Sequence, residues 1–379
     1  MNRNLDLIEI SGIRKFYNKV VEVPGALSLT IGEPDFPVPK EVKKAMIDAI
    51  NNNLTKYTSN IGIEPLRESI SAYLSKNKIN YSKDEICITV GGSEGLFNVF
   101  QMLLNPGDKV IIPTPAYPAY ESIVKLIGGN VVNCPVKEDL SLDLEALQNL
   151  IRNENAKALI LSYPSNPTGN CMSKNEFDVI AKMLENENIV IISDEMYGSL
   201  CFKEYYSIAQ HEKLREKTIL VGGFSKMFSM TGLRIGYVCA KDEYLSQILK
   251  VHQYNVSCAP SIAQWGAYEG LNNAMYHVEH IKEELKKRRD YVYGRLIELG
   301  FDTIKPEGAF YIFPNIKKYS LNSEEFCEKL LKQAKVAAVP GSAFGIGGEG
   351  HMRISYCSGM DALVEGMNRI QNFVYTINN

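Results

Sequence analysis

The sequence predicts an α/β protein: a three-layer αβα domain with a mostly parallel seven-stranded sheet, joined to a smaller α+β domain formed by both ends of the chain. Two observations predict this fold. Through the middle of the 379-residue chain, short apolar runs alternate with amphipathic helical segments, and this alternation is typical of a largely parallel sheet covered on both faces. The two ends lack that alternation and mix strand and helix signals, so we expect them to form a separate unit.

The candidate strands of the central sheet are apolar runs bounded by turn residues. They are Ile86–Val90, Val110–Ile112, Val131–Cys134, Ala158–Ser162, Ile189–Ser193, Thr218–Val221 and Ile235–Ala240. Helical periodicity lies between them at Leu96–Leu104, Leu142–Ile151 and Ser173–Glu185. The last of these segments begins with Ser173 and has Glu176 three residues later, which is a capping box and predicts a helix start at that point.

The domain division follows from where the alternation starts and stops. We expect a large domain over residues 46–270 and a small domain made of residues 1–45 and 271–379. A helical stretch from about Asn272 to Leu299 opens the second part of the small domain. Because no linker rich in Pro, Gly or Ser separates the two units, composition does not define the boundary near residue 270 sharply.

Composition and charge exclude several classes of protein. Hydrophobic residues make up 45% of the chain and charged residues 22%, which excludes a disordered or fibrous protein. The 41 basic and 44 acidic residues give a formal charge of -3. Since nucleic-acid and acidic-membrane surfaces require a basic excess, neither partner is expected.

The expected location follows from the N-terminus and the cysteines. Met1–Glu9 is too polar for a signal peptide, and no apolar run reaches the ~18 residues of a membrane span. No two of the eight cysteines stand at CxxC spacing, and several lie in apolar runs where a reduced, buried thiol is the ordinary outcome. We therefore expect a cytoplasmic protein with reduced thiols and no metal site.

A glycine-rich segment near the C-terminus invites a nucleotide-binding interpretation. Gly345–Gly350 satisfies the pattern GxGxxG, but that motif requires a strand before it and a helix opening on it. Here it runs into His351–Tyr356, which alternates like a strand. A flexible loop is therefore the better interpretation.

The candidate functional site is at the carboxyl ends of the strands, where open parallel sheets bind ligands. Each polar residue there has an ordinary explanation: turn chemistry for Asn166, helix capping for Asp194 and surface exposure for Lys226. Their coincidence at one edge of the predicted sheet favours a functional interpretation. The segments that follow four of the strands are Gly91–Glu94, Tyr163–Gly169, Asp194–Tyr197 and Gly222–Lys226.

These groups suit one small molecule. A helix start with a serine at position 93, together with Arg234, suits a phosphate monoester. A lysine near cations and shielded from water has a lowered pKa and can attack an aldehyde, as expected for Lys226. The Asp194 carboxylate can keep a ring nitrogen protonated. Phosphate, aldehyde and pyridine nitrogen together describe pyridoxal 5′-phosphate.

With these residues the chain resembles a known family, the class I/II aminotransferases of the aspartate aminotransferase superfamily. Its members are fold type I pyridoxal-phosphate enzymes. The resemblance rests on Ser165–Gly169, Asp194–Tyr197 and Ser225–Gly236, which match the family's motifs in order and spacing. It extends from the Gly32 loop to Arg353, which is nearly the whole chain.

The resemblance implies a role for each residue around the cofactor ring. Lys226 would bind the cofactor aldehyde and then move a proton between the substrate Cα and the cofactor C4′. Asp194 would pair with the pyridine nitrogen, and Tyr197 and Asn166 would hold the 3′ oxygen. Tyr117 is similar to the aromatic residue that stacks on the ring.

The resemblance also implies a phosphate site that needs a second subunit. Tyr57 is similar to the tyrosine that reaches the phosphate from the partner subunit, so a homodimer is expected. The residues of the same chain that would contact the cofactor in this region are Gly92, Ser93, Glu94, Ser225 and Arg234.

The substrate-binding residues implied by the resemblance are Arg353, Gly32 and Asn166. Arg353 would bind the substrate α-carboxylate; from the residues alone, a structural ion pair is the default for this arginine. Gly32 would close over that carboxylate, and closure would exclude water. Two positions depart from the pattern: Ser93 replaces the lysine of the bacterial aspartate-specific branch, and Gly223 replaces a hydroxyl residue common in relatives.

The resemblance implies an aminotransferase that moves the amino group of an L-amino acid (aspartate-like, aromatic or other) to a 2-oxo acid such as 2-oxoglutarate by a ping-pong mechanism. One alternative on the same scaffold is a pyridoxal-phosphate-dependent C–S β-lyase similar to cystathionine β-lyase. A second is a cofactor-sensing transcription regulator, which needs an appended DNA-binding domain. Few residues precede Gly32 and no basic excess is found, so the regulator is the least favoured.

Overall fold

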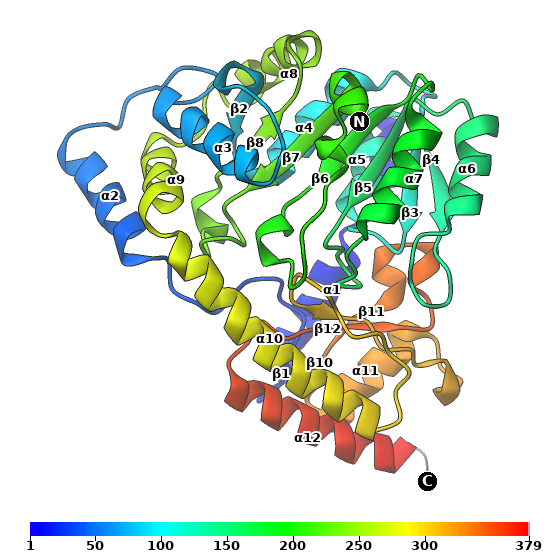
Figure 1. Cartoon of the computed structure of the whole chain (residues 1–379). Coiled ribbons are helices and arrows are strands. Elements are labelled where there is room, and N and C mark those ends of the chain that lie inside the picture. The colour runs from blue at the N-terminus through cyan, green and yellow to red at the C-terminus, as the bar shows by residue number, and fades with distance from the viewer. Residues whose placement is uncertain (378–379) are drawn as a thin grey trace.

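A computed structural model describes residues 1–377 of the chain. At its centre lies one seven-stranded sheet with the order β2-β8-β7-β6-β5-β3-β4 (Figure 1). Every strand is parallel to its neighbours except β8, which is antiparallel to both β2 and β7. The predicted α/β fold with a mostly parallel sheet is therefore confirmed. The strands are β2 (Ile86–Thr89), β3 (Lys109–Thr114), β4 (Asn130–Pro135), β5 (Ala158–Ser162), β6 (Val190–Asp194), β7 (Thr218–Gly223) and β8 (Gly236–Cys239).

Helices cover both faces of this sheet (Figure 1). Neighbouring strand residues divide between two apolar clusters: Ile160 packs with α4, α5 and α8, whereas Leu159 packs with α6 and α7. This alternation is the period of two expected of a strand buried on both faces. The helices are α4 (Gly91–Leu103), α5 (Ala119–Ile127), α6 (Leu144–Asn153), α7 (Lys174–Leu184) and α8 (Asp242–Asn255).

Local signals in the sequence determine where two of these helices begin. The Ser173 hydroxyl accepts from the backbone N–H of Glu176, and the Glu176 carboxylate accepts from the backbone N–H of Ser173 at 2.7 Å, so the capping box at the start of α7 is confirmed. Helix α4 follows β2 after a single residue. Its first residue, Gly91, has φ +71°, and a Cβ there would lie 2.5 Å from Nη2 of Arg234.

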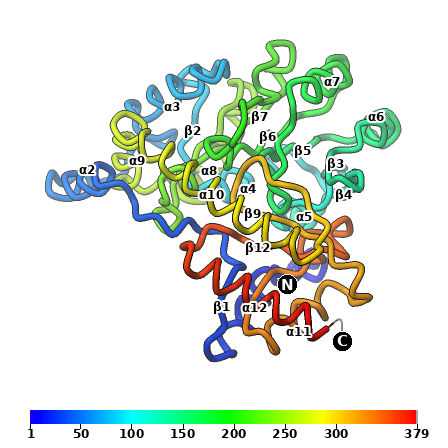
Figure 2. Tube along the Cα trace, turned by 60° about the horizontal axis from the view of Figure 1, so that its bottom comes forward, coloured from blue at the N-terminus to red at the C-terminus, as the bar shows by residue number. Residues whose placement is uncertain are grey.

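Segments from both ends of the chain pack into one smaller α+β unit. Strand β1 pairs in parallel with β10, while β9, β12 and β11 form an antiparallel sheet. Figure 2 shows β1 from the N-terminal part of the chain in the same unit as α11 and α12 from the C-terminal part. Phe16 from near the N-terminus shares an apolar cluster with Phe326 and Phe373 from near the C-terminus. The elements are α1 (Gly12–Val21), β1 (Leu27–Ser28), α10 (Met275–Glu298), β9 (Tyr311–Ile312), α11 (Ser323–Ala334), β10 (Val336–Ala337), β11 (Val339–Pro340), β12 (Met352–Ser355) and α12 (Met360–Ile377).

The domain bounds 1–45, 46–270 and 271–379 stay a prediction, and residues 378–379 lie outside the described residues. Three further helices lie beside the central sheet or lead away from it: α2 (Lys40–Asn51), α3 (Glu64–Lys76) and α9 (Ser261–Asn273). The helical stretch expected from Asn272 is divided, because α9 ends at Asn273 and α10 starts at Met275. Within residues 1–377, none of the helices combines the length and apolarity that a membrane crossing needs.

The glycine-rich segment Gly345–Gly350 forms a connection between β11 and β12, as expected of a loop. It contains a short 3-10 turn over Ile346–Gly348, and no α-helix opens on it. A Cβ on Gly341 would lie 1.9 Å from the carbonyl oxygen of Gly348. The turn at Gly341–Phe344 and the turn at Ile346–Gly348 pack closely against each other. This contact accounts for a glycine at positions 341 and 348 without a bound nucleotide.

Candidate active site

The structure brings most of the predicted residues together where the central sheet meets the terminal unit. Asp194 ends β6, Lys226 follows β7, and Asn166 lies in the loop after β5. Arg353 comes from β12 of the terminal unit, and Gly32 from the loop after β1. The site is thus built from five segments that are far apart in the sequence.

The Lys226 amine lies under the Gly32 loop. Its Nζ donates to the Gly32 carbonyl oxygen at 2.7 Å and lies 6.0 Å from the centre of the Phe310 ring. The pKa of Lys226 is lowered to about 8, mainly by burial and in small part by the nearby cations Arg234 and Arg353, against the effects of Cys357 and Glu33. An amine with this pKa is partly neutral near physiological pH and can act as a nucleophile or base.

Asp194 is buried at the end of β6 and accepts two hydrogen bonds. The Tyr120 hydroxyl donates to its Oδ2 at 2.7 Å, and the backbone N–H of Met196 donates to its Oδ1 at 3.1 Å. Burial raises the pKa of Asp194, and both hydrogen bonds oppose that rise. Sequence reasoning missed Tyr120, because nothing in the sequence links a tyrosine on α5 to a strand 74 residues away.

The start of α4 and Arg234 form a cationic corner suited to a phosphate. Ser93 in the first turn is exposed, and the Arg234 guanidinium packs on Gly91 while donating to the Thr231 carbonyl oxygen at 2.8 Å. Arg234 has φ +52°, a conformation that aims its side chain back at the start of α4. Ser225 is buried beside this corner.

Met196 explains the glycine at position 223. A Cβ on Gly92 would lie 2.4 Å from Cε of Met196, and a Cβ on Gly223 would lie 2.9 Å from the same atom. The methionine therefore fills the space that a hydroxyl side chain at position 223 would need.

The Glu94 side chain does not face this corner. Its Oε2 accepts from the backbone N–H of Val90 at 2.9 Å, and its Oε1 contacts Nδ1 of His252 at 3.0 Å and accepts from the Asn98 amide. The carboxylate therefore joins α4 to α8 inside the protein. The Glu94 side chain therefore does not contact the cofactor as expected. The group of Glu94 that is left for such a contact is its backbone N–H. Nothing in the sequence pointed to the partner His252.

Arg353 is 2% exposed and has no carboxylate partner among residues 1–377. Its Nη1 donates to Oδ1 of Asn166 at 2.9 Å and its Nη2 to the Thr30 carbonyl oxygen at 2.6 Å, while Nε has no partner. The guanidinium also lies 4.4 Å from the Tyr311 ring centre. Burial lowers its pKa. The structural ion pair that was the default is not found in the part of the chain that the structure describes.

Two phenols lie between Arg353 and the Gly32 loop. The hydroxyls of Tyr197 and Tyr311 are 2.8 Å apart, and a Cβ on Gly32 would lie 2.1 Å from the Tyr311 oxygen. Burial raises the pKa of Tyr197, and raises that of Tyr311 to about 12, so both are neutral at physiological pH. Tyr311 was not among the predicted site residues, and no motif in the sequence marks it.

Tyr117 and Tyr57 differ in their surroundings. Tyr117 packs edge-on against Tyr120 with ring centres 5.5 Å apart, and burial raises its pKa. Tyr57 is 88% exposed in the segment between α2 and α3. No hydrogen bond in the described part of the chain joins Tyr57 to the other site residues.

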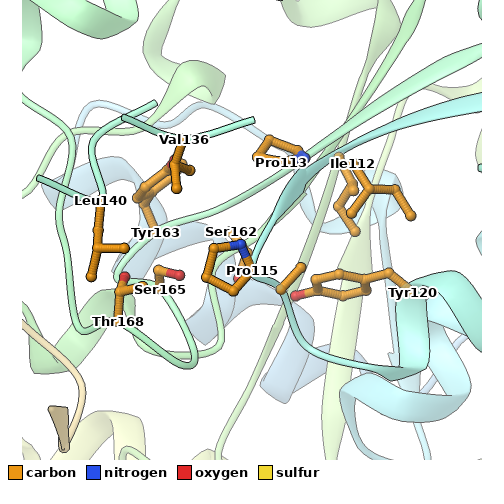
Figure 3. A pocket seen from close by; sticks show the side chains of 12 residues that line it. Ile112, Pro113, Pro115, Tyr120, Val136, Leu140, Ser162, Tyr163, Ser165 and Thr168 are labelled. Carbon is orange, nitrogen blue, oxygen red and sulfur yellow. The ribbon is translucent and has the colours of Figure 1, made fainter. Parts of the chain in front are cut away.

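Two hollows adjoin the site. A cavity of about 20 Å³ lies behind it, lined by Tyr120, Ser162 and Ser165 among others (Figure 3); it has room for about one water molecule. A groove of about 640 Å³ opens between α1 and α5, with Tyr117 and Phe344 in its lining. Phe344 also contacts the Arg353 guanidinium, 4.8 Å from the ring centre, so this ring separates the groove from the arginine, which is not part of the groove's lining.

Comparison with known proteins identifies the family. The model of the family described as "Aminotransferase class I and II" matches residues 24–367. The chain is 45% identical to a probable N-acetyl-LL-diaminopimelate aminotransferase of Bacillus subtilis, over 97% of this chain and 94% of that protein. It is 40% identical to an aspartate aminotransferase of Pyrococcus abyssi, over 98% of this chain and 97% of that protein.

Solved structures agree with these sequences. The aromatic aminotransferase of Pyrococcus horikoshii superposes with a TM-score of 0.90 at 37% identity, covering 95% of this chain and 99% of that chain. The aspartate aminotransferase of Thermus thermophilus with maleate superposes with a TM-score of 0.93 at 32% identity, covering 98% and 99%. The chain belongs to the class I and II aminotransferases and is a transaminase.

Proposed function

We propose that this aminotransferase uses pyridoxal 5′-phosphate to transfer the amino group of an L-amino acid to a 2-oxo acid such as 2-oxoglutarate by a ping-pong mechanism. The observation that carries the proposal is that one site holds two cationic groups: the half-buried Lys226 amine, with a pKa of about 8, and the buried Arg353 guanidinium, with no carboxylate partner in residues 1–377. One is suited to an aldehyde and the other to a carboxylate.

The residues present fit this cofactor. Lys226 would hold the aldehyde and Asp194 the pyridine nitrogen, while the start of α4 with Ser225 and Arg234 would hold the phosphate. Tyr197 and Asn166 supply a phenol and an amide for the 3′ oxygen, and Tyr117 an aromatic ring for stacking. When bound, the group supplies an electron sink for the electrons released at the substrate Cα.

Proton transfer falls to Lys226. Its Nζ is mostly neutral above about pH 8. It can therefore take the proton from the substrate Cα and deliver it to the cofactor C4′. The hydrogen bonds from Tyr120 and Met196 favour the charged form of Asp194 and oppose burial, which raises its pKa. Facing a pyridine nitrogen, the carboxylate would keep that nitrogen protonated.

Arg353 orients the substrate. A carboxylate would complete its hydrogen bonding and compensate a buried positive charge, which is costly when unpaired. Gly32 lies close enough to the site for its loop to cover the substrate, since its carbonyl oxygen already reaches Lys226 at 2.7 Å. Closure of this loop would exclude water during the reaction.

The donor's side chain is proposed to be longer than that of aspartate. Ser93 supplies no charge for a distal carboxylate, and the groove of about 640 Å³ beside Tyr117 and Phe344 offers more space than aspartate needs. Relatives are named for N-acetyl-LL-diaminopimelate, aromatic amino acids and aspartate, so these three donors are the ones to compare.

We further propose a cytoplasmic homodimer in which Tyr57 reaches the partner's phosphate site. Exposed apolar side chains in and just after α2 support this: Ile47, Ile50 and Leu54 are 56%, 51% and 42% exposed, beside Tyr57. Such a run of exposed apolar side chains is typical of a protein interface.

A panel of donors tests the reaction type. The protein loaded with cofactor is mixed with each amino acid, first without and then with 2-oxoglutarate. Amino transfer that depends on the 2-oxo acid is the expected result. Release of pyruvate and ammonia from cystathionine without any acceptor would instead identify the β-lyase.

A further inference from the structure

Two cysteines outside the proposed catalytic machinery lie in contact. The sulfur atoms of Cys171 and Cys201 are 3.4 Å apart, although the residues are 30 positions apart in the chain. Cys171 is partly exposed and Cys201 is buried, and both are free thiols. The contact between them was not apparent from the sequence.

Backbone hydrogen bonds hold the chain around both cysteines against the segment Glu307–Gly308. The carbonyl oxygen of Gly169 accepts from the backbone N–H groups of Glu307 and Gly308, at 2.9 and 3.0 Å, just before Cys171. Cys201 forms an isolated antiparallel bridge with the same Gly308. A Cβ on Gly308 would lie 2.9 Å from the sulfur of Cys171, so a glycine there leaves room for the two thiols to meet.

The two thiols are chemically unequal. The pKa of Cys201 is lowered by its hydrogen bond with the Cys171 sulfur, by the backbone N–H of Lys203 and by the nearby charges of Lys203 and Lys282, against the effect of burial. The pKa of Cys171 is raised, because its proton is shared with the Cys201 sulfur. Either sulfur can donate in this contact, so when the shared proton lies on Cys201 the Cys171 sulfur, which is the one that solvent reaches, is the thiolate that meets an oxidant.

We propose that Cys171 and Cys201 are a reversible disulfide site that responds to hydroperoxides. A disulfide is about 2.05 Å long, so the sulfur atoms need to approach by only about 1.4 Å. The proposal concerns the folded chain and does not depend on the cofactor or on the substrate.

The reaction balances with one hydroperoxide as oxidant. The Cys171 sulfur attacks the terminal oxygen, the O–O bond breaks, and an alcohol (or water, from hydrogen peroxide) leaves as Cys171 becomes a sulfenic acid. The Cys201 sulfur then attacks the Cys171 sulfur, the S–O bond breaks and water leaves. The two thiols together lose two electrons and two protons, which the hydroperoxide accepts. An external thiol reverses the change by exchange.

The disulfide would join two loops of the site to each other. Cys171 lies five residues after Asn166, and Cys201 lies four residues after Tyr197. Because the cross-link closes a loop in the unfolded chain, the oxidised protein is expected to unfold at a higher temperature than the reduced protein.

Peptide mass mapping of the full-length protein tests the proposal. After treatment with hydrogen peroxide and alkylation of the remaining thiols, the peptides containing Cys171 and Cys201 should be joined, with the loss of two hydrogen atoms. Reduction should separate them, and the melting temperature should fall back to that of untreated protein.

Matched variants locate the reaction. Cys171→Ser and Cys201→Ser should each abolish the rise in melting temperature on oxidation, whereas Cys258→Ser should retain it, since Cys258 is also partly exposed but is not part of the pair. The proposal is overturned if the two cysteines of the wild-type protein stay alkylatable, or become separate sulfinic acids, while circular dichroism shows an intact fold.

Discussion

Nη1 of Arg353 donates a hydrogen bond of 2.9 Å to Oδ1 of Asn166. The arginine belongs to β12 in the terminal unit, and the asparagine to the loop after β5 of the central sheet, so this bond connects the two parts of the molecule at the proposed site. The second guanidinium nitrogen binds the Thr30 carbonyl oxygen at 2.6 Å, which adds the segment after β1. The arginine is thus held in place before a substrate arrives.

Arg353→Gln is expected to raise the KM for both the amino acid and the 2-oxo acid. Removing the charge-assisted hydrogen bonds to a carboxylate costs about 3 kcal/mol, which corresponds to about a 100-fold loss of kcat/KM. Steady-state kinetics measure this loss, and Arg353→Lys, which keeps the charge but not the forked geometry, should lose less. A normal KM for both substrates in Arg353→Gln would contradict the assignment.

Lys226→Met is expected to stabilise the cofactor-free protein at neutral pH. Burial lowers the folded-state pKa of Lys226 to about 8, against an ordinary value of about 10.4. Between these values the unfolded chain binds more protons, so this group's contribution to the free energy of unfolding rises with pH. Below pH 8 the buried charge therefore lowers the free energy of unfolding by its full amount, about 3 kcal/mol. Above about pH 10.4 this loss disappears.

Urea unfolding of both cofactor-free proteins from pH 7 to 11 measures this difference. The advantage of Lys226→Met should shrink as the pH rises through that window. Lys109→Met is a matched control, because Lys109 is a half-buried lysine whose charge is paired with Glu154 at 2.9 Å. Turnover of the cofactor-loaded wild type and Lys226→Met tests the catalytic role. Lys226→Met should have no measurable turnover, and normal turnover would refute the role of Lys226.

Glu94→Ala is expected to weaken cofactor binding without altering the chemistry. The carboxylate fixes the first turn of α4 through the Val90 N–H and His252, and its loss leaves buried polar groups unpaired at a cost of about 1–3 kcal/mol. Cofactor affinity should fall about 10-fold or more, with kcat unchanged at saturating cofactor. A reduced kcat at saturation would assign the residue to catalysis instead.

Gly223→Ser is expected to destabilise the protein, although the family resemblance implies a hydroxyl residue at this position. Its Cβ would lie 3.2 Å from the Cα of Gly236 and 3.3 Å from the carbonyl oxygen of Ile235, which cannot move aside as Cε of Met196, at 2.9 Å, can; overpacking of this kind costs about 1–3 kcal/mol. Met196→Ala removes one of these three contacts, so the double variant should be destabilised by somewhat less than the two single variants added together. Additive effects in thermal unfolding would show that the two residues do not compete for space.

The strands of the central sheet and the motif residues at their ends could be predicted, but the elements of the terminal unit and the contacts between side chains could not. All seven strands, and the capping box at Ser173, follow from local patterns of apolar and capping residues. Asp194 and Lys226 stand out because they end strands whose carboxyl ends share one edge. Tyr120, Tyr311 and His252 reach the same region from distant segments, and a single sequence holds no information on which tyrosine or histidine faces a given carboxylate. The direction of the Glu94 side chain depends on α8 for the same reason.

Hybrid dimers provide the test for Tyr57. If Tyr57 completes the partner's site, a dimer of one Lys226→Ala chain and one Tyr57→Ala chain contains one fully wild-type site, because Lys226 from the second chain meets Tyr57 from the first. Random mixing of the two inactive or weakened variants should then restore about a quarter of all sites to wild-type turnover and cofactor affinity. If Tyr57 acts within its own chain, each site of the hybrid keeps one defect and mixing restores nothing. Turnover at limiting cofactor, measured before and after subunit exchange, distinguishes the two outcomes.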